Sequence, residues 1–292
     1  MKISVLEAPV HLGSPTTGSE RAFSALVSGG LVDILGKETR FYPMAMPLNE
    51  VINKPDPDNM KGLSRVMSIN RTLSASVKSE IEEGRLPIIV GGDHSSAIGS
   101  IAGASAVYGA DDLSVIYIDG HTDINTENTT VTGYIHGMTL ASAMGLCCDE
   151  LTVGRKVNLH GKNIFIVGAR SIDPPEYGII DEQNVTLYEI DEVKRRGIPA
   201  VMDEIIGKIT TPHIHVSFDV DFVDGAEFPS TGYIMPNGAS FDDACLAVGR
   251  CFETGRVCSM DIVEYNPTVD NGSDMRKLFR LFDIVRELTA DN

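Results

Sequence analysis

Short runs of apolar, often β-branched residues recur along the chain, and stretches with helical periodicity separate them. The runs are residues 86–90, 113–118, 163–168, 213–218 and 257–263. Near-continuous hydrophobicity over such short segments is typical of strands that are buried on both faces of a sheet. The five runs therefore predict parallel strands in the interior of an α/β protein.

The intervening segments carry apolar residues at the three- and four-residue spacing of amphipathic helices. The clearest helix is predicted for residues 61–83, and Gly84 follows it as a C-terminal cap. Ser240 and Asp243 have the spacing of a capping box at the start of another helix. The further helices are expected at about residues 95–108, 136–146, 198–208, 240–254 and 273–289.

This alternation of strands and helices predicts a three-layer α/β/α fold with a central, mostly parallel sheet. A length of 292 residues allows one large domain or two small ones, and the chain shows neither an internal repeat nor a clear linker. The Pro- and Asp-rich segment 53–59 is expected to be a surface loop rather than a hinge. We therefore expect a single domain over residues 1–292.

Composition narrows the possible locations and partners. No run of 18 apolar residues is present, and the first residues contain no apolar stretch as long as that of a signal peptide. Five cysteines without paired spacing indicate neither a disulfide framework nor a zinc ribbon. The formal charge of −17 disfavours nucleic acid and could attract cationic substrates. We expect a cytoplasmic protein with no membrane or nucleic-acid partner.

Polar segments follow all five predicted strands. Because the carboxyl ends of parallel strands meet at one edge of a sheet, side chains in these segments are expected to lie close together. The segments are GGDHSS at 91–96, DGHTDIN at 119–125, GARSIDPPE at 168–176, DVDFVDG at 219–225 and EYNP at 264–267. The sequence therefore predicts a functional site at this edge.

Two of these segments place acids and histidines at alternate positions, where the side chains of an extended chain share a face. Together with one histidine after the first strand, they supply four carboxylates and two imidazoles: His94, Asp119, His121, Asp123, Asp219 and Asp221. Four carboxylates repel one another unless cations neutralise them, and two divalent ions balance the charge. Carboxylate and imidazole ligands without thiolate favour Mn²⁺, with Fe²⁺, Co²⁺ and Ni²⁺ as alternatives. Solvated strand ends would explain one such residue, but six together favour a metal site.

The motifs from residue 86 to residue 267 resemble the ureohydrolase (arginase/agmatinase) family and are most similar to arginase. The resemblance implies a dinuclear manganese centre, with two Mn²⁺ per chain, that hydrolyses a guanidino group to urea and an amine. It implies that Asp119 and Asp219 bridge the ions. The ligands of one ion would be His94, Asp119, Asp123 and Asp219, and those of the other Asp119, His121, Asp219 and Asp221. The family also implies a homo-oligomer, either a trimer or a hexamer.

The reaction explains why such a site is needed. A guanidinium is resonance-stabilised and a poor electrophile, whereas a hydroxide that bridges two metal ions is a strong nucleophile available at neutral pH. The resemblance implies that Asp123 carries a proton to the leaving amine. It further implies that Glu264 orients the guanidinium and that His136 shuttles protons. The other histidines, at positions 11, 160, 213 and 215, are expected to be structural.

The same resemblance indicates arginine as the substrate. An arginine-specific pocket needs neutral donors for the α-carboxylate and an acid for the α-ammonium. Asn125, Thr130 and Thr132 align with the carboxylate-binding residues of arginase, and Asp173 and Glu176 lie where the ammonium would bind. The predicted reaction is hydrolysis of L-arginine to urea and L-ornithine.

Several positions depart from the arginase pattern. Tyr233 stands where arginases have a threonine, and we expect its hydroxyl to hold Glu264 rather than its ring to fill the guanidinium pocket. Gly120 and Phe222 also differ, as does the segment SPTTGSERAF at 14–23. Two alternatives therefore stay open. One is a related enzyme acting on agmatine, guanidinobutyrate or formiminoglutamate, and the other is a catalytically silent regulatory protein of the same fold.

Overall fold

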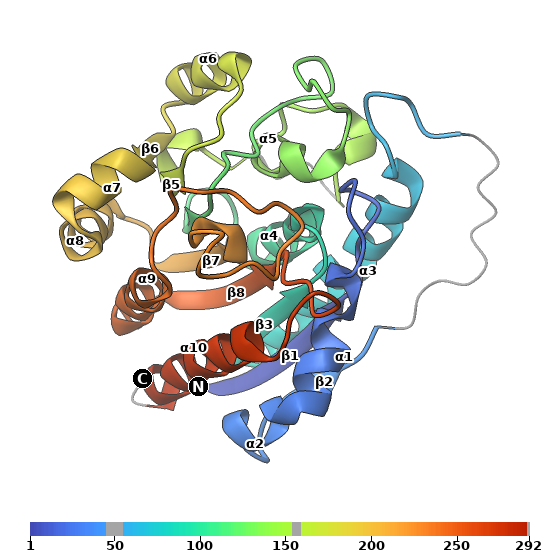
Figure 1. Ribbon diagram of the computed structural model, residues 1–292. Helices are drawn as coiled ribbons and strands as arrows, with labels where there is room; N and C mark the ends of the chain where they lie inside the picture. Colours follow the sequence, from blue (N-terminus) through green and yellow to red (C-terminus); the bar gives the residue numbers. More distant parts are fainter. Residues whose placement is uncertain (45–54, 154–158, 291–292) are drawn as a thin grey trace.

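The computed structural model describes residues 1–44, 55–153 and 159–290. Within these ranges, eight strands form a single sheet in the order β2-β1-β3-β8-β7-β4-β5-β6, and every pairing is parallel (Figure 1). The strands are β1 (Lys2–Ala8), β2 (Arg40–Tyr42), β3 (Arg85–Gly91), β4 (Leu113–Ile118), β5 (Ile164–Ala169), β6 (Thr186–Glu189), β7 (His213–Asp219) and β8 (Val257–Val263). The predicted fold class is confirmed, with a sheet that is parallel throughout.

Helices cover both faces of this sheet and enclose two hydrophobic clusters. The helices are α1 (Ala22–Leu26), α2 (Val32–Leu35), α3 (Leu63–Glu82), α4 (Ala97–Tyr108), α5 (Thr139–Ala143), α6 (Pro174–Gln183), α7 (Ile190–Arg196), α8 (Ile198–Lys208), α9 (Phe241–Glu253) and α10 (Ser273–Ala290). Helices α3, α4, α5 and α6 contribute to the cluster on one face, whereas α1, α2, α7, α8, α9 and α10 contribute to the other. The chain therefore has the three layers expected from its sequence.

Strand β4 shows how the apolar runs produce this arrangement. All six of its residues are buried, and successive side chains of a strand point to opposite faces. Ile116 and Ile118 join the cluster beneath α8 and α9, while Val115 and Tyr117 join the cluster beneath α3 and α4. A strand covered on both sides needs apolar residues at every position, which is why the run shows no polar alternation.

The five predicted strands are confirmed as β3, β4, β5, β7 and β8, and the Ser240–Asp243 capping box is present at α9. The helix predicted for residues 136–146 is wrong in extent. A 3₁₀ turn over Ile135–Met138 precedes the short helix α5, and Gly145 has a positive φ of 72°. Part of the predicted 53–59 loop, residues 53 and 54, lies outside the described residues; 55–59 contain no helix or strand.

The strand order brings the polar segments together. Strands β3, β8, β7, β4 and β5 are consecutive neighbours in the sheet, so the loops at their carboxyl ends share one edge. The chain passes from β3 to β4 across the later strands β8 and β7, and such crossings create the crevices where α/β proteins bind ligands. No helix in the described part of the chain is long and apolar enough to cross a membrane. The single-domain organisation stays a prediction.

Candidate metal centre

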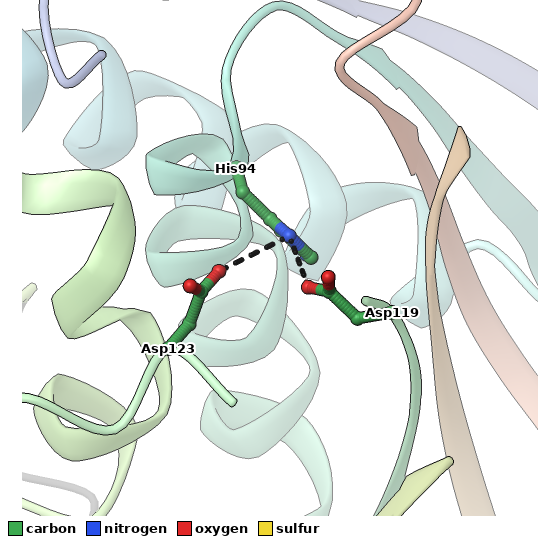
Figure 2. Close-up of side chains that lie close together, drawn as sticks. All are labelled: His94, Asp119 and Asp123. Carbon is green, nitrogen blue, oxygen red and sulfur yellow. Dashed lines mark ion pairs between the residues drawn. The ribbon is translucent and has the colours of Figure 1, made fainter. Parts of the chain in front are cut away.

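The imidazole of His94 faces three carboxylates in the interior. Its Nδ1 atom lies 2.9 Å from Oδ2 of Asp119, 3.3 Å from Oδ2 of Asp123 and 3.1 Å from Oδ2 of Asp219. Figure 2 shows His94 and two of these acids converging, His94 from the turn before α4 and the acids from the segment after β4. All four side chains are buried. They form the first half of a candidate metal centre.

The second half lies around His121, whose side chain is 23% exposed. Its Nδ1 atom is 3.0 Å from Oδ2 of Asp221 and 3.5 Å from Oδ1 of Asp119. The two oxygens of Asp119 therefore face two different imidazoles, which is the geometry expected of a bridging ligand. Asp219 directs Oδ2 toward His94, while its Oδ1 accepts the backbone N–H of Asp221 at 2.8 Å.

The hydrogen bonds of His94 leave its Nδ1 atom available to a cation. Ser217 donates its hydroxyl hydrogen to Asp261, so at its 2.8 Å contact with His94 it accepts from Nε2–H. In the neutral ring, Nδ1 then carries only a lone pair. His94 Nδ1 and Asp119 Oδ2 are buried atoms without a hydrogen-bond partner in the described structure. Such atoms facing each other fit the ligands of a divalent ion.

The charges of this cluster are balanced by protons when no cation is present. Burial, reinforced by the charge of Asp119, raises the pKa of Asp123 to about 7. Burial and the neighbouring Asp221 and Asp119 also raise the pKa of Asp219 well above its ordinary value. Although burial lowers the pKa of His94, its contacts with Asp119 and Asp219 raise it well above the ordinary histidine value. Divalent cations would displace these protons.

A buried polar network behind His94 supports its orientation. Asp261, which is 0% exposed, accepts hydrogen bonds from Ser217, from Ser100 at 2.6 Å and from Nε2 of His215 at 2.9 Å. These contacts hold Ser217 against the ring of His94. His215 is thus a structural residue, as expected, and Asp261 and Ser217 are functional residues that the sequence analysis missed. An acid within the apolar run 257–263 was the available signal, because an unpaired charge there would be costly.

Two residues of the site have backbone conformations that residues other than glycine rarely adopt. Asp123 has φ +46° and Glu264 has φ +63°, both in the left-handed region. Glu264 accepts the backbone N–H of His94 at 3.0 Å, and its Oε1 lies 3.6 Å from Nδ1 of His136. Strained residues of this kind concentrate at functional sites. Here they belong to two acids predicted to take part in the reaction.

A pocket of about 190 Å³ opens beside the candidate metal ligands. Its lining includes His121, Asp123 and His136. It also includes all six residues predicted to contact substrate: Asn125, Thr130, Thr132, Asp173, Glu176 and Tyr233. The structure therefore brings the six residues predicted to contact substrate around one opening, together with two of the candidate metal ligands.

The polar residues of this pocket differ in how free they are to bind a ligand. Asn125 donates from Nδ2 to Asp173 at 2.9 Å, which orients both side chains at the rim. Both oxygens of Glu176 already accept backbone N–H groups, from Ile124 at 3.0 Å and from Asp173 at 2.7 Å. Glu176 is therefore engaged in holding two loops, and Asp173 is the better candidate for a substrate ammonium.

Tyr233 does not occupy the position that we expected. Its side chain is 53% exposed, and its ring meets the imidazole of His121 edge-on, with centroids 5.4 Å apart and an interplanar angle of 79°. Among the described residues, Glu264 contacts the backbone N–H of His94 and the ring of His136, and no hydrogen bond joins it to Tyr233. The expected hydrogen bond from the Tyr233 hydroxyl to Glu264 is thus not formed, because the ring lies at the exposed side of the pocket, beside His121.

Arg170 is a further residue that the sequence analysis did not single out. Its guanidinium donates to the backbone carbonyls of Asp221 at 2.6 Å and Pro236 at 3.0 Å, and so fixes the loop after β7. A Cβ atom on Gly120 would lie 2.6 Å from Nη1 of Arg170 and 2.9 Å from Oδ1 of Asp221. Gly120, a departure from the arginase pattern, therefore leaves the space that Arg170 uses.

Comparison with known proteins places this geometry in a family. The sequence model described as the Arginase family matches residues 2–288. The chain belongs to the arginase family. It is 34% identical over 281 residues to the arginase of Bacillus subtilis (strain 168), covering 92% of each chain.

Solved structures of arginases have the same fold as this chain. The arginase from Bacillus cereus superposes with a TM-score of 0.89 at 30% identity, covering 100% of this chain and 99% of that one. The Entamoeba histolytica arginase in complex with L-ornithine also gives 0.89, at 29% identity and with coverage of 98% and 97%. The family membership inferred from the motifs is thereby confirmed, and the two clusters of ligand-type side chains lie in an arginase-family fold.

Proposed function

We propose that this protein is an arginase, which hydrolyses L-arginine to L-ornithine and urea with two manganese ions per chain. One observation carries the proposal. Asp119 directs its two oxygens at His94 and His121, and the facing Nδ1 atom of His94 is buried without a hydrogen bond. The family membership of the chain supports the same reaction.

The ligands follow from the two halves of the candidate centre. One ion would be held by His94, Asp119, Asp123 and Asp219, and the other by Asp119, His121, Asp219 and Asp221. When bound, two divalent cations lower the pKa of a water molecule so that it is a nucleophile at neutral pH. Asp119 faces both imidazoles, and the bridging role of Asp219 is proposed from the family pattern.

The remaining site residues orient the substrate and move protons. Glu264 would accept hydrogen bonds from the guanidinium, whose planar fork of N–H groups suits a carboxylate. Asp123 lines the pocket and would pass a proton to the leaving amine, which departs only when protonated. His136, whose Nδ1 lies 3.6 Å from Glu264 and which also lines the pocket, would exchange protons with solvent.

The rim of the pocket supports an α-amino acid as the substrate. Asn125, Thr130 and Thr132 offer uncharged donors on one segment, and Asp173 offers a carboxylate beside them. Uncharged donors suit the α-carboxylate of arginine, and the acid suits its α-ammonium. Agmatine keeps the ammonium but lacks the α-carboxylate, so it would leave the contacts of Asn125, Thr130 and Thr132 unused.

Urea release from manganese-loaded protein tests the proposal. Arginine, agmatine and guanidinobutyrate should be compared as sources of urea, and formiminoglutamate as a source of formamide. We expect arginine to have the highest kcat/KM. Preference for another compound would support a sister ureohydrolase, and no turnover of any of them would support the silent regulatory protein.

A matched variant links turnover to the proposed centre. Asp119→Asn keeps the size of the side chain but removes the charge shared by the two halves, so it should abolish urea release. Asp111→Asn, at an exposed acid paired with His160, should leave activity unchanged. The homo-oligomeric assembly and the cytoplasmic location stay predictions, and light scattering of the purified protein would test the first.

A further inference from the structure

Tyr117 contacts two of the proposed metal ligands at once. It lies in β4, two residues before Asp119, and its side chain is 0% exposed. Its hydroxyl donates to Oδ2 of Asp123 at 2.8 Å. Its ring stacks on the imidazole of His94 with centroids 4.4 Å apart and an interplanar angle of 5°. One buried side chain thus connects the strand to an acid and a histidine that come from different loops.

The two contacts restrain different degrees of freedom. The parallel stack restricts the plane of the imidazole, while the Ser217 contact fixes which nitrogen bears hydrogen. The hydroxyl holds the Asp123 oxygen that faces Nδ1 of His94, 3.3 Å away. Asp123 also has the strained φ of +46°, and the hydrogen bond from Tyr117 anchors its side chain on the side that faces His94.

We propose that Tyr117 is a positioning residue of the metal centre, which aligns His94 through its ring and Asp123 through its hydroxyl. This inference rests on the proposed function, because it assigns Tyr117 to the same metal site. Tyr117 does not line the pocket, so it acts on the ligands and not on the substrate. Residues that orient metal ligands typically contribute about 10- to 100-fold to metal affinity or activity.

Two substitutions separate the contributions of the ring and the hydroxyl. Tyr117→Phe keeps the stack on His94 and removes only the hydrogen bond to Asp123. It should weaken manganese binding by about 10-fold or more and lower kcat, while KM for arginine changes by less than about twofold. Tyr117→Leu also removes the stack and should weaken manganese binding further.

Tyr265→Phe is the matched control. Tyr265 is buried like Tyr117, and its hydroxyl also donates to an aspartate, Asp270, at 2.7 Å. This bond lies at the start of α10 rather than at the metal site. Tyr265→Phe should therefore lower the midpoint of thermal unfolding to a similar extent as Tyr117→Phe, without weakening manganese binding.

The experiment is calorimetric titration of metal-free protein with manganese, for the wild type and the three variants. Weaker binding in Tyr117→Phe but not in Tyr265→Phe supports the inference. Equal affinity in Tyr117→Phe and wild type would overturn it, and would do so even if wild-type protein hydrolyses arginine. Failure of wild-type protein to bind manganese would overturn both this inference and the proposed function. If wild type binds manganese but leaves arginine intact, only the proposed function fails.

Discussion

The imidazole of His94 and the carboxylate of Asp119 face each other across 2.9 Å, and the two facing atoms are buried without a hydrogen bond in the described structure. A buried donor or acceptor without a partner typically costs about 1–3 kcal/mol. Two such atoms that face each other are both satisfied when a positively charged group lies between them. A divalent cation satisfies both, and a proton is its substitute in the metal-free protein.

The shared role of Asp119 leads to a prediction about metal content. Asp119→Ala should reduce the manganese bound per chain below that of His94→Ala, because it removes oxygens facing both halves of the centre. Elemental analysis after manganese loading and desalting measures the stoichiometry, with two ions expected for the wild type. Greater loss in His94→Ala than in Asp119→Ala would show that the carboxylate does not bridge.

Metal binding should also depend on pH in a defined direction. In the metal-free protein, burial and the charge of Asp119 raise the pKa of Asp123 to about 7, and neighbouring acids raise that of His94 despite its burial. Both groups hold protons that manganese must displace, so manganese affinity should increase as the pH rises through about 7. Calorimetric titration between about pH 6 and pH 8, in buffers of different ionisation enthalpy, measures affinity and proton release. Affinity that does not change with pH would contradict the protonation states inferred here.

The same shifts have a consequence for stability. An acid whose pKa is raised by folding stabilises the folded state at low pH, and this contribution is lost as the pH rises through the folded-state pKa. For Asp123 the window extends from about 4, the ordinary value, to about 7. The metal-free protein should therefore become less stable across this range, and bound manganese should remove the loss. Thermal unfolding with and without manganese provides the comparison.

The sequence predicts the parts of this molecule whose signals are local. The strands β3, β4, β5, β7 and β8 are apolar on both faces, so they appear as continuous runs. The candidate metal-ligand set is recognisable in the sequence because Asp119, His121 and Asp123 repeat along one segment. Strand β6 (Thr186–Glu189) was missed because it is short and its residues are only partly buried. Helices α1 and α2 span five and four residues, too few for a periodic pattern.

Contacts between segments distant in sequence could not be predicted in the same way. In the sequence, Tyr117 is one of several residues in a continuous apolar run. Only the folded chain shows that its hydroxyl donates a hydrogen bond to Asp123. Arg170 acts on carbonyls more than 50 residues away, for which no sequence pattern exists. The expected partner of Tyr233 was inferred from its position in a motif. The direction of its side chain depends on a loop conformation that the motif does not encode.

The network behind His94 should contribute to both stability and metal affinity. Asp261→Asn removes the negative charge that accepts hydrogen bonds from Ser100, Ser217 and His215. It also places an amide N–H₂ group, which is a donor, among these donors. It should lower the free energy of unfolding by about 1.5–3 kcal/mol, the usual contribution of hydrogen bonds to a charged group. It should also weaken manganese binding by about 10-fold or more, because His94 is less firmly oriented.

The control for this variant is Asp270→Asn. Asp270 accepts hydrogen bonds from Tyr265 and from backbone N–H groups at the start of α10, so its loss should also destabilise the fold. Manganese affinity should be unaffected. Chemical denaturation and manganese titration of both variants test the distinction. If Asp261→Asn lowers stability but binds manganese as tightly as wild type, the network has no role in orienting the ligand.

Glu264 should be required for turnover and not for metal binding. Glu264→Gln keeps an oxygen that can accept the backbone N–H of His94, a bond 3.0 Å long, so the metal ligands should stay in place. The guanidinium would lose its anionic partner, and kcat/KM for arginine should fall by about 100-fold or more. Steady-state kinetics and elemental analysis on the same preparation test this. Loss of manganese in Glu264→Gln would instead indicate a structural role in the centre.

Tyr233 lies at the mouth of the pocket, edge-on to His121 and 53% exposed, which changes what its substitutions should do. Its hydroxyl makes no hydrogen bond to Glu264 in the described structure, so Tyr233→Phe should alter kcat/KM for arginine by less than about twofold. Tyr233→Ala removes a wall of the pocket and should raise KM by about 3- to 10-fold with little change in kcat, because the ring would contact substrate equally before and during reaction. Tyr177→Ala, at an exposed tyrosine outside the pocket lining, is the control and should change neither constant. If Tyr233→Phe slowed turnover by about 10-fold or more, the hydroxyl would act on the reacting groups after all. A strong gain of arginine turnover in Tyr233→Thr would show instead that the ring obstructs arginine.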